Sequence, residues 1–254
     1  AVLGAGLQGT CVALELAARG RRVDLYDRQS ACLTGASLAN EGKIHLGYVY
    51  ANDASRRTAR AMTRGALCFA PLMRRWLGPA FDALPVTPPF LYAVSRASLV
   101  AVDAIQAHLD DCVAIARDVA QDEGGDYFGR DFRAPARRMK PAEWEATIDS
   151  RTVAAVFETC ETAIDPEAVA ALVRERIAAT PEIAPRLGTT VTAVSDLGSG
   201  FAVDFTTADG RGREVYDHVV NATWEGRLAI DASLGLRPER PWLWRLRRIA
   251  RVLT

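Results

Sequence analysis

The chain has 254 residues, enough for one or two domains, and its 49% hydrophobic content is ample for a buried core. Lysine plus arginine and aspartate plus glutamate number 31 each, which removes any whole-chain electrostatic case for nucleic acid or an anionic membrane. No uninterrupted apolar run is long enough for a transmembrane helix, and no charged-then-apolar leader is visible. We therefore expect no transmembrane segment and no nucleic-acid partner.

The five cysteines are odd in number, widely scattered and without a CxxC pair. They predict free thiols in a cytoplasmic protein and no metal site. Both ends of the sequence lie within apolar stretches, at Ala1–Leu3 and at residues 248–254. We therefore expect a fragment that lacks a few N-terminal residues and a substantial C-terminal part.

The first thirty residues carry the most informative motif. An apolar strand, Ala1–Leu3, runs into a glycine-rich turn, and a helix is predicted from about Leu7 to Ala18. A second apolar strand, Arg22–Tyr26, ends at Asp27. Strand, turn, helix, strand and acid in this order are the dinucleotide-binding βαβ fingerprint. A purely structural βαβ turn is the alternative, and the motif alone does not separate FAD from NAD.

Each residue of the fingerprint has a physical task. Gly4 permits the tight turn out of the strand, and Gly6 lets a pyrophosphate approach the backbone. Gly9 lets helix and strand pack closely, and the helix N-terminus offers free N–H groups to phosphate. Asp27 is placed to accept hydrogen bonds from a ribose 2′-hydroxyl, which argues against a 2′-phosphate, although Arg28 stands beside it.

The segment from Arg28 to Lys43 is polar, rich in small residues and without helical or strand periodicity. Long loops of this kind are commonly functional, so we expect a loop laid against a ligand. A structural loop over the end of the sheet is the alternative.

The middle of the chain predicts helices and strands in alternation. Helical patterns cover Asp53 to Trp76, with Asp53 or Ser55 as cap, and about Ala97 to Ala120. The arginines of the first helix indicate a solvated face rather than a nucleic-acid surface. Strands are expected at Phe90–Ser95 and Arg151–Phe157, and the stretch between residues 127 and 149 reads as irregular, with a buried tryptophan as its anchor.

The last third predicts a helix followed by short strands. Asp165 and Pro166 are typical of a helix start, and strands are expected over 183–194, 201–206 and 214–220. The arginine-rich end, residues 237–251, indicates an exposed strand, with a membrane-surface or nucleic-acid patch as the alternative.

Several of these segments together resemble a known family. The combination of GAGLQG, Asp27, TGASLANEGKIHLGYVYANDASRRTARAMTRGA and the later VVNATW resembles the D-amino-acid oxidase superfamily of FAD-dependent oxidoreductases. That superfamily includes glycine and sarcosine oxidases, glycerol-3-phosphate dehydrogenases and L-2-hydroxyglutarate dehydrogenases, and the central segment is most similar to the last type. The resemblance implies an α/β fold, a Rossmann-like FAD-binding domain with a discontinuous second α+β substrate domain.

The resemblance also implies domain limits and cofactor contacts. The FAD-binding domain would comprise residues 1–80 and 158–235, and the incomplete substrate domain residues 81–157 and 236–254. The residues expected to contact FAD are Gly4, Ala5, Gly6, Leu7, Gln8, Gly9, Asp27, Arg28, Ser37, Asn40, Gly42, Lys43, His45, Gly47, Val191, Asn221, Ala222, Thr223 and Trp224. Trp224 stands where the family more often has a small residue, so either the backbone turns without glycine or the indole covers the cofactor edge.

A flavin would supply the redox chemistry, and the protein must position a substrate C–H bond and handle a proton. His45 is the expected catalytic residue, as a base or as a stabiliser of reduced flavin; a structural histidine is the alternative. The leading hypothesis is an FAD-dependent oxidase or dehydrogenase acting on a small amino acid, amine or 2-hydroxy acid. An NAD-dependent dehydrogenase and a non-catalytic flavin- or nucleotide-binding protein are the rivals, and the electron acceptor is left open.

Overall fold

A computed structural model describes residues 1–242, and contacts divide them into two compact units. The first unit comprises residues 1–41 and 166–242, and the second comprises residues 42–165. These limits do not coincide with the limits at 80/81 and 157/158 expected from the sequence. The assignment of one part to FAD and of the other to substrate stays a prediction. Residues 243–251 of the expected exposed strand lie outside the described residues, and residues 237–242 form no strand.

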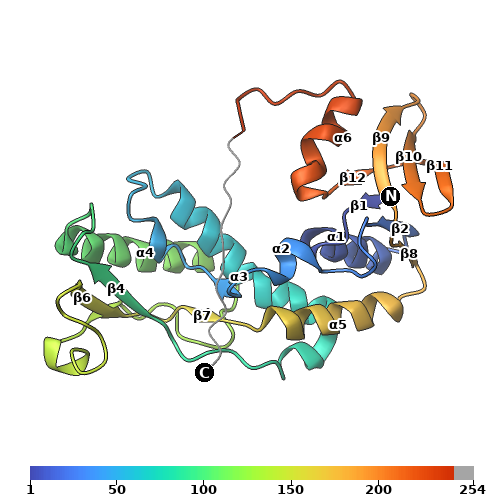
Figure 1. Cartoon of the computed structure of the whole chain (residues 1–254). Helices are drawn as coiled ribbons and strands as arrows, with labels where there is room; N and C mark the ends of the chain where they lie inside the picture. The colour runs from blue at the N-terminus through green and yellow to red at the C-terminus, as the bar shows by residue number, and fades with distance from the viewer. Residues whose placement is uncertain (243–254) are drawn as a thin grey trace. The chain divides into compact units, whose positions relative to one another are not determined.

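A four-stranded parallel sheet lies at the centre of the first unit, in the order β12-β1-β2-β8 (Figure 1). Val2 pairs with Leu25 on one side and with Val220 on the other, and Val23 pairs with Ile183. Both central strands are buried, which accounts for their apolar sequences. The strands of this sheet are β1 (Val2–Leu3), β2 (Val23–Tyr26), β8 (Ile183–Arg186) and β12 (Val220–Asn221).

The helices of the first unit include the two that the sequence predicts with clear start signals. Helix α1 spans Leu7–Ala18, and α5 begins at the predicted proline, Pro166–Ala178. The expectation that the loop after the second strand lacks regular structure is wrong, because α2 (Gly35–Leu38) forms one turn there. One turn is too short to produce a periodic pattern in the sequence. The 3-10 helix η4 (Trp224–Gly226) leads into α6 (Arg227–Ser233).

A three-stranded antiparallel sheet completes the first unit, in the order β11-β10-β9. Its strands are β9 (Thr190–Asp196), β10 (Phe201–Thr207) and β11 (Gly210–Tyr216). The single strands expected over 183–194 and 214–220 are wrong, because the first is divided into β8 and β9 and the second into β11 and β12. The chain breaks between β8 and β9 at Gly188, whose φ of 65° lies in the left-handed region.

The second unit contains two long helices, a three-stranded antiparallel sheet of order β4-β6-β5 and the two-stranded pair β3-β7. Its helices are α3 (Arg57–Leu77), η1 (Tyr48–Tyr50), η2 (Gly78–Phe81), α4 (Val102–Glu123) and η3 (Pro141–Glu143). Its strands are β3 (Lys43–Ile44), β4 (Leu91–Ser95), β5 (Arg137–Arg138), β6 (Val153–Glu158) and β7 (Thr162–Ala163). Helix α4 begins five residues later than expected, after a turn in which Ser98 Oγ accepts the Val100 N–H.

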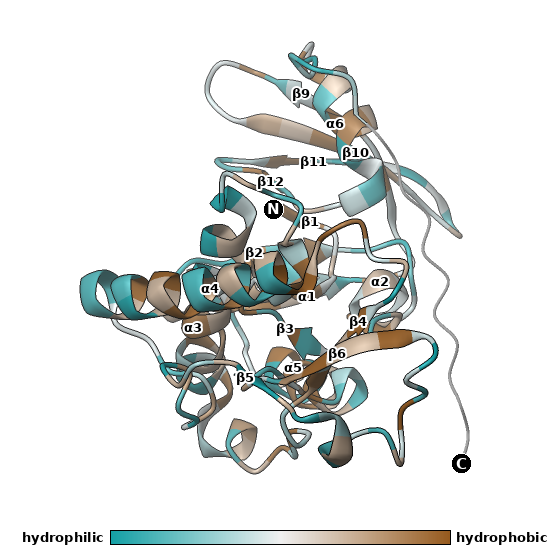
Figure 2. Ribbon diagram, turned by 90° about the vertical axis from the view of Figure 1, so that its left-hand side faces the viewer, coloured by the Kyte–Doolittle hydropathy of each residue, from teal (hydrophilic) through white to brown (hydrophobic). Residues whose placement is uncertain are grey.

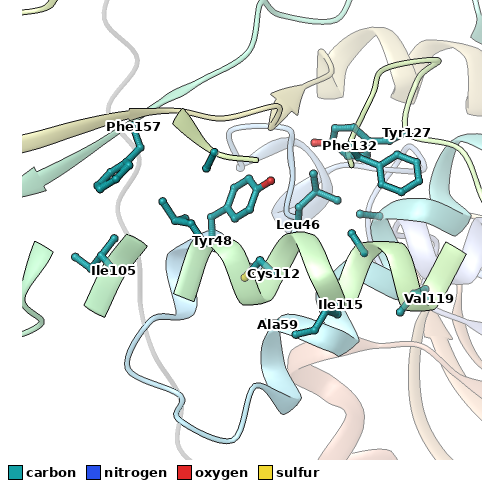
Figure 3. Close-up of a cluster of buried hydrophobic side chains, with 14 of the residues drawn as sticks. Leu46, Tyr48, Ala59, Ile105, Cys112, Ile115, Val119, Tyr127, Phe132 and Phe157 are labelled. Atoms are coloured by element: carbon teal, nitrogen blue, oxygen red, sulfur yellow. The ribbon is translucent and has the colours of Figure 1, made fainter. Parts of the chain in front are cut away.

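The core of the second unit lies between α3, α4 and the sheet. Figure 3 shows Tyr48 beside the green ribbon of α4, from which Cys112 and Ile115 project. Turns of α4 alternate between brown and teal in Figure 2, as expected of a helix with one buried face. The predicted anchor Trp144 is buried.

Three arginines of α3 and its preceding turn pair with acids of α4. Arg56, Arg60 and Arg64 lie 3.0, 3.4 and 2.8 Å from Asp111, Asp118 and Glu123. These contacts account for the arginine spacing by ion pairs on the outer faces of two packed helices. Among the described residues, no helix is long and apolar enough to cross a bilayer.

Candidate active site

The glycine-rich turn is as tight as its sequence predicts. Gly4 has a φ of 98°, and a Cβ atom there would lie 2.5 Å from the carbonyl oxygen of Ala222. A Cβ atom on Gly9 would lie 1.8 Å from the carbonyl oxygen of Gly4. In both cases the Cβ atom would meet backbone atoms, so no side-chain movement could relieve the clash. These two glycines allow β1, α1 and the end of β12 to meet.

The start of α1 offers unpaired backbone donors. The first intrahelical hydrogen bond runs from Thr10 N–H to the Gly6 carbonyl, at 3.0 Å, so the N–H groups of Gln8 and Gly9 precede it. Leu7 N–H donates to Ser37 Oγ of α2 at 2.9 Å. A Cβ atom on Gly6 would lie 3.2 Å from that same Oγ. Backbone donors, a hydroxyl group and the positive end of the helix therefore meet at Gly6, an arrangement that suits an anion.

Asp27 holds the turn from the end of β2. Its Oδ2 accepts the Ala5 N–H at 2.7 Å, and its Oδ1 accepts the Gln29 N–H at 2.8 Å. A carboxylate has about four lone-pair sites, so two are left for hydroxyl groups of a ligand. The neighbouring Arg28 instead pairs with Glu225, and both side chains are more than half exposed.

Arg174 of α5 is a residue of this region that sequence reasoning missed. Its guanidinium donates to the carbonyls of Cys32 and Leu33 at 2.8 and 3.2 Å. Leu33 has a φ of 51°, and its N–H donates to the Ala5 carbonyl at 2.8 Å. Arg174 thus secures the loop that follows Asp27 against the glycine-rich turn. An arginine within a helix carries no local signal of this contact.

The strand end after β12 presents backbone rather than side chains. Asn221 Nδ2 donates to Asp231 Oδ1 at 2.8 Å, and its Oδ1 accepts the Thr223 hydroxyl at 2.6 Å. Ala222 N–H donates to the Leu3 carbonyl at 2.8 Å. The Asn221 amide is therefore committed to holding this turn. Trp224 has a φ of 53° and is 72% exposed, so the backbone turns here as glycine would allow.

Two further predicted residues of the first unit have structural contacts. Val191 on β9 is partly buried against the cluster that contains Leu3 and Tyr26. Asn40 Nδ2 donates to the carbonyls of Ala36 and Ser37 at 3.2 and 3.0 Å, and so closes the end of α2.

The remaining predicted residues, Gly42, Lys43, His45 and Gly47, belong to the second unit. The Gly42 carbonyl accepts the Ile164 N–H at 3.0 Å, and Lys43 Nζ lies 5.0 Å from the centre of the Phe90 ring. Gly47 has a φ of 98°, and a Cβ atom there would lie 2.8 Å from the Cβ of Ala59. Packing against α3 therefore explains this glycine without a ligand.

His45 lies opposite Glu161, a residue that sequence reasoning also missed. Strands β3 and β7 pair Lys43 with Ala163 and Ile44 with Thr162. Continuation of this antiparallel register by one residue places His45 across from Glu161, and their Nδ1 and Oε1 atoms are 3.6 Å apart. The side chain of Glu161 is 6% exposed and that of His45 23%.

Other titratable groups near this pair are held neutral. Burial raises the pKa values of the Tyr48 and Tyr127 phenols, and the charge of Glu161 raises them further. Burial lowers the pKa of His108, whose Nε2 lies 3.1 Å from the Gly47 carbonyl. His108 is fully buried.

Comparison with known proteins identifies the family. The family model described as FAD dependent oxidoreductase (DAO) matches residues 1–253. The chain therefore belongs to the DAO family of FAD-dependent oxidoreductases, and the predicted resemblance is confirmed.

Three relatives illustrate the match. A D-amino acid dehydrogenase of Cereibacter sphaeroides is 40% identical over 95 residues, 37% of this chain and 21% of that protein. Glycine oxidase from Geobacillus kaustophilus has a TM-score of 0.62 at 18% identity over 93% of this chain and 58% of its own. L-proline dehydrogenase from P. horikoshii has a TM-score of 0.62 at 17% identity over 94% of this chain and 56% of its own. The two structures share the fold, and this chain spans just over half of their length.

FAD is the cofactor of this family, and the residues of the first unit fit it. The fit rests on the glycines without room for a Cβ, the donors at Gln8 and Gly9, and the Asp27 carboxylate with acceptor capacity to spare. Gly4, Ala5, Gly6, Leu7, Gln8, Gly9, Asp27 and Ser37 are brought together within the first unit, and Ala222 and Thr223 join them through the contact with Gly4. The α/β expectation is confirmed, and FAD is favoured over the NAD alternative.

Proposed function

We propose that the whole protein oxidises a small amino acid, with FAD bound along the first unit. The observation that supports the cofactor position most directly is the anion-binding start of α1. There, Gly6 has no side chain, Ser37 supplies a hydroxyl and the N–H groups of Gln8 and Gly9 have no earlier partner in the helix. A diphosphate of FAD satisfies all of these donors.

In this proposal, Asp27 accepts hydrogen bonds from the ribose hydroxyls, as its two remaining acceptor sites allow. Ala222 and Thr223 contribute backbone groups at the end of β12. Gly42, Lys43, His45 and Gly47 stay predicted contacts of the flavin half. The flavin accepts a hydride when bound; the chain's own tasks are to bind, to orient and to move a proton at His45.

The substrate class is supported by the named relatives, which include a D-amino acid dehydrogenase, a glycine oxidase and an L-proline dehydrogenase. A 2-hydroxy acid is the second candidate, because an L-alpha-glycerophosphate oxidase from Mycoplasma pneumoniae shares the fold with a TM-score of 0.54. Its substrate is an alcohol, so the same fold serves C–OH oxidation as well.

Anaerobic titration of the full-length holoenzyme tests this function. Small neutral amino acids of both configurations, N-methyl and cyclic amino acids, and 2-hydroxy acids are added separately while the visible flavin absorbance is followed. We expect amino acids to bleach the flavin and 2-hydroxy acids to leave it oxidised. Bleaching by 2-hydroxy acids alone would replace the proposed substrate class, and bleaching by neither class would contradict the proposed oxidation.

We propose that the protein works in a reducing compartment such as the cytoplasm, because its cysteines are free thiols. All five, Cys11, Cys32, Cys68, Cys112 and Cys160, are unpaired. Burial raises the pKa of Cys11 and of Cys112 to about 12, so both stay as thiols at neutral pH.

A further inference from the structure

The pair formed by His45 and Glu161 is a buried polar contact that packing alone does not explain. Nδ1 of His45 is buried and has no hydrogen-bond partner, while the Glu161 carboxylate stands 3.6 Å away. A buried nitrogen without a hydrogen-bond partner is unfavourable, so its closeness to a carboxylate indicates a contact that forms with a small ring movement. The other ring nitrogen of His45, Nε2, is not among the buried polar atoms that lack a hydrogen-bond partner.

Hydrogen bonds hold Glu161 in place near Nδ1 of His45. Its Oε1 accepts the Leu46 N–H at 2.7 Å, and its own N–H donates to Thr159 Oγ1 at 3.3 Å. Within the described part of the chain, Glu161 has no ion-pair partner except His45. The other titratable groups that feel its charge are Tyr48, Tyr92, Tyr127, Cys112 and Cys160, whose pKa values burial raises, so they stay neutral.

We propose that Glu161 is a positioning residue that keeps the proton of neutral His45 on Nδ1 and leaves the lone pair on Nε2. A carboxylate can only accept a hydrogen bond, so it selects the tautomer with hydrogen on the nitrogen that faces it. A carboxylate that orients an imidazole in this manner fixes both ring direction and tautomer. Histidine in water favours the opposite tautomer, so the inference has a distinct spectroscopic signature.

The inference rests on the proposed function for its chemical meaning. In an amine oxidation, the substrate N–H bond breaks, its electron pair stays on nitrogen and the proton passes to Nε2 of His45. The resulting imidazolium is balanced by the Glu161 carboxylate. Glu161 therefore acts through His45 and does not itself touch the reacting atoms.

The two other histidines, His108 and His218, serve as internal references for the tautomer of His45. Nε2 of His108 faces the Gly47 carbonyl at 3.1 Å, and a carbonyl also only accepts, so His108 carries its proton on Nε2. His218 is exposed and should follow the preference seen in water. His45 is thus expected to differ from both in one spectrum.

Nitrogen-15 NMR of histidine-labelled, full-length holoenzyme at alkaline pH tests the proposal, with signals assigned by loss in His45→Gln, His108→Gln and His218→Gln. We expect His45 as the Nδ1–H tautomer in the wild type. In Glu161→Leu no acceptor faces Nδ1, so His45 should switch to the Nε2–H tautomer that histidine favours in water, and His108 should not change. An Nε2–H tautomer in the wild type would overturn the proposal even if Glu161→Leu fails to fold. An unchanged tautomer in a folded Glu161→Leu protein would overturn it as well. Because flavin bleaching is not measured here, this failure is separate from a failure of the proposed amino acid oxidation.

Discussion

At the scale of single residues, Trp224 combines a glycine-like backbone with the largest side chain. Its φ of 53° is sterically unfavourable for any residue with a Cβ atom, by about 1–2 kcal/mol. The indole is 72% exposed, so it regains little of that energy by burial. The sequence resemblance predicts a small residue at this position, and the backbone conformation is the one that glycine would adopt.

Replacement of Trp224 by glycine should therefore stabilise the protein. We expect Trp224→Gly to exceed Trp224→Ala in free energy of unfolding by about 1 kcal/mol, measured by urea denaturation of the apoprotein. Alanine is the matched control because it removes the indole but keeps the Cβ atom. Equal stability of the two variants would show that φ at this position is not strained.

Some residues of the candidate site could be predicted from sequence and others could not, for physical reasons. Gly4 and Gly9 are needed by contacts within one βαβ unit, so the local motif reveals them. Glu161 faces His45 only through the register of two strands far apart in the chain, and Gly47 is fixed by packing against Ala59. Pairings of this kind leave no local pattern.

At the scale of elements, the start of α3 depends on Asp53. Its Oδ2 accepts the Thr58 N–H at 2.9 Å, and its Oδ1 accepts the Ser55 hydroxyl at 2.5 Å. The hydrogen bond from Ser55, followed by that from Thr58, lowers the pKa of Asp53 below its ordinary value of 3.8. Ser55 Oγ also accepts the Arg57 N–H at 3.3 Å, so both residues that the sequence left as alternatives accept from the first turn of the helix.

This cap should give a pH-dependent contribution to stability. Because the pKa is lowered in the folded state, the contribution is present above about pH 4 and is lost as the pH falls through the folded pKa. We expect Asp53→Ala to lower the urea midpoint at pH 7, and the difference from wild type to narrow below pH 3.8. Asp53→Asn also lacks the titrating charge, so its difference from wild type should narrow over the same pH range, while the two variants should differ from each other by an amount that does not depend on pH. A pH-independent difference for the alanine variant would contradict the role of the carboxylate.

Some boundaries of helices and strands could be predicted from the sequence and others could not. The starts of α1 and α5 are marked by glycine and proline, and both were predicted to the residue. The one-turn helix α2 and the breaks around Gly188 were not, because short elements lack periodicity and strand pairing is decided at long range.

At the scale of the whole molecule, the first unit joins two sheets through tyrosine hydroxyls. Tyr216 of β11 donates to Asp24 Oδ2 of β2 at 2.7 Å, and the hydroxyls of Tyr26 and Tyr216 are 2.7 Å apart. Arg186 of β8 also lies 3.2 Å from Asp24. The parallel and antiparallel sheets are thereby held together by one polar network next to a shared apolar cluster.

Removal of the Tyr216 hydroxyl, which contacts both Asp24 and Tyr26, should lower the free energy of unfolding more than removal of the Tyr26 hydroxyl. Tyr216→Phe leaves the Tyr26 hydroxyl unpaired in a residue that is 1% exposed, so we expect a loss of about 1–2 kcal/mol on urea unfolding. Tyr26→Phe keeps the bond to Asp24 and should cost less. The reverse order would show that the network does not run through Tyr216.

The central claim is that the start of α1 holds the diphosphate of FAD. The most direct test is the FAD affinity of the full-length apoprotein, measured by quenching of flavin fluorescence, for the wild type, Gly6→Val and Gln8→Ala. A side chain at Gly6 would crowd Ser37 Oγ, 3.2 Å from its Cβ, and block the approach to the helix N–H groups, so affinity should fall at least about tenfold, or 1.4 kcal/mol. Gln8→Ala keeps its backbone N–H and should stay within about threefold of wild type, or ~0.65 kcal/mol. A folded Gly6→Val protein that binds FAD as tightly as wild type would contradict the claim.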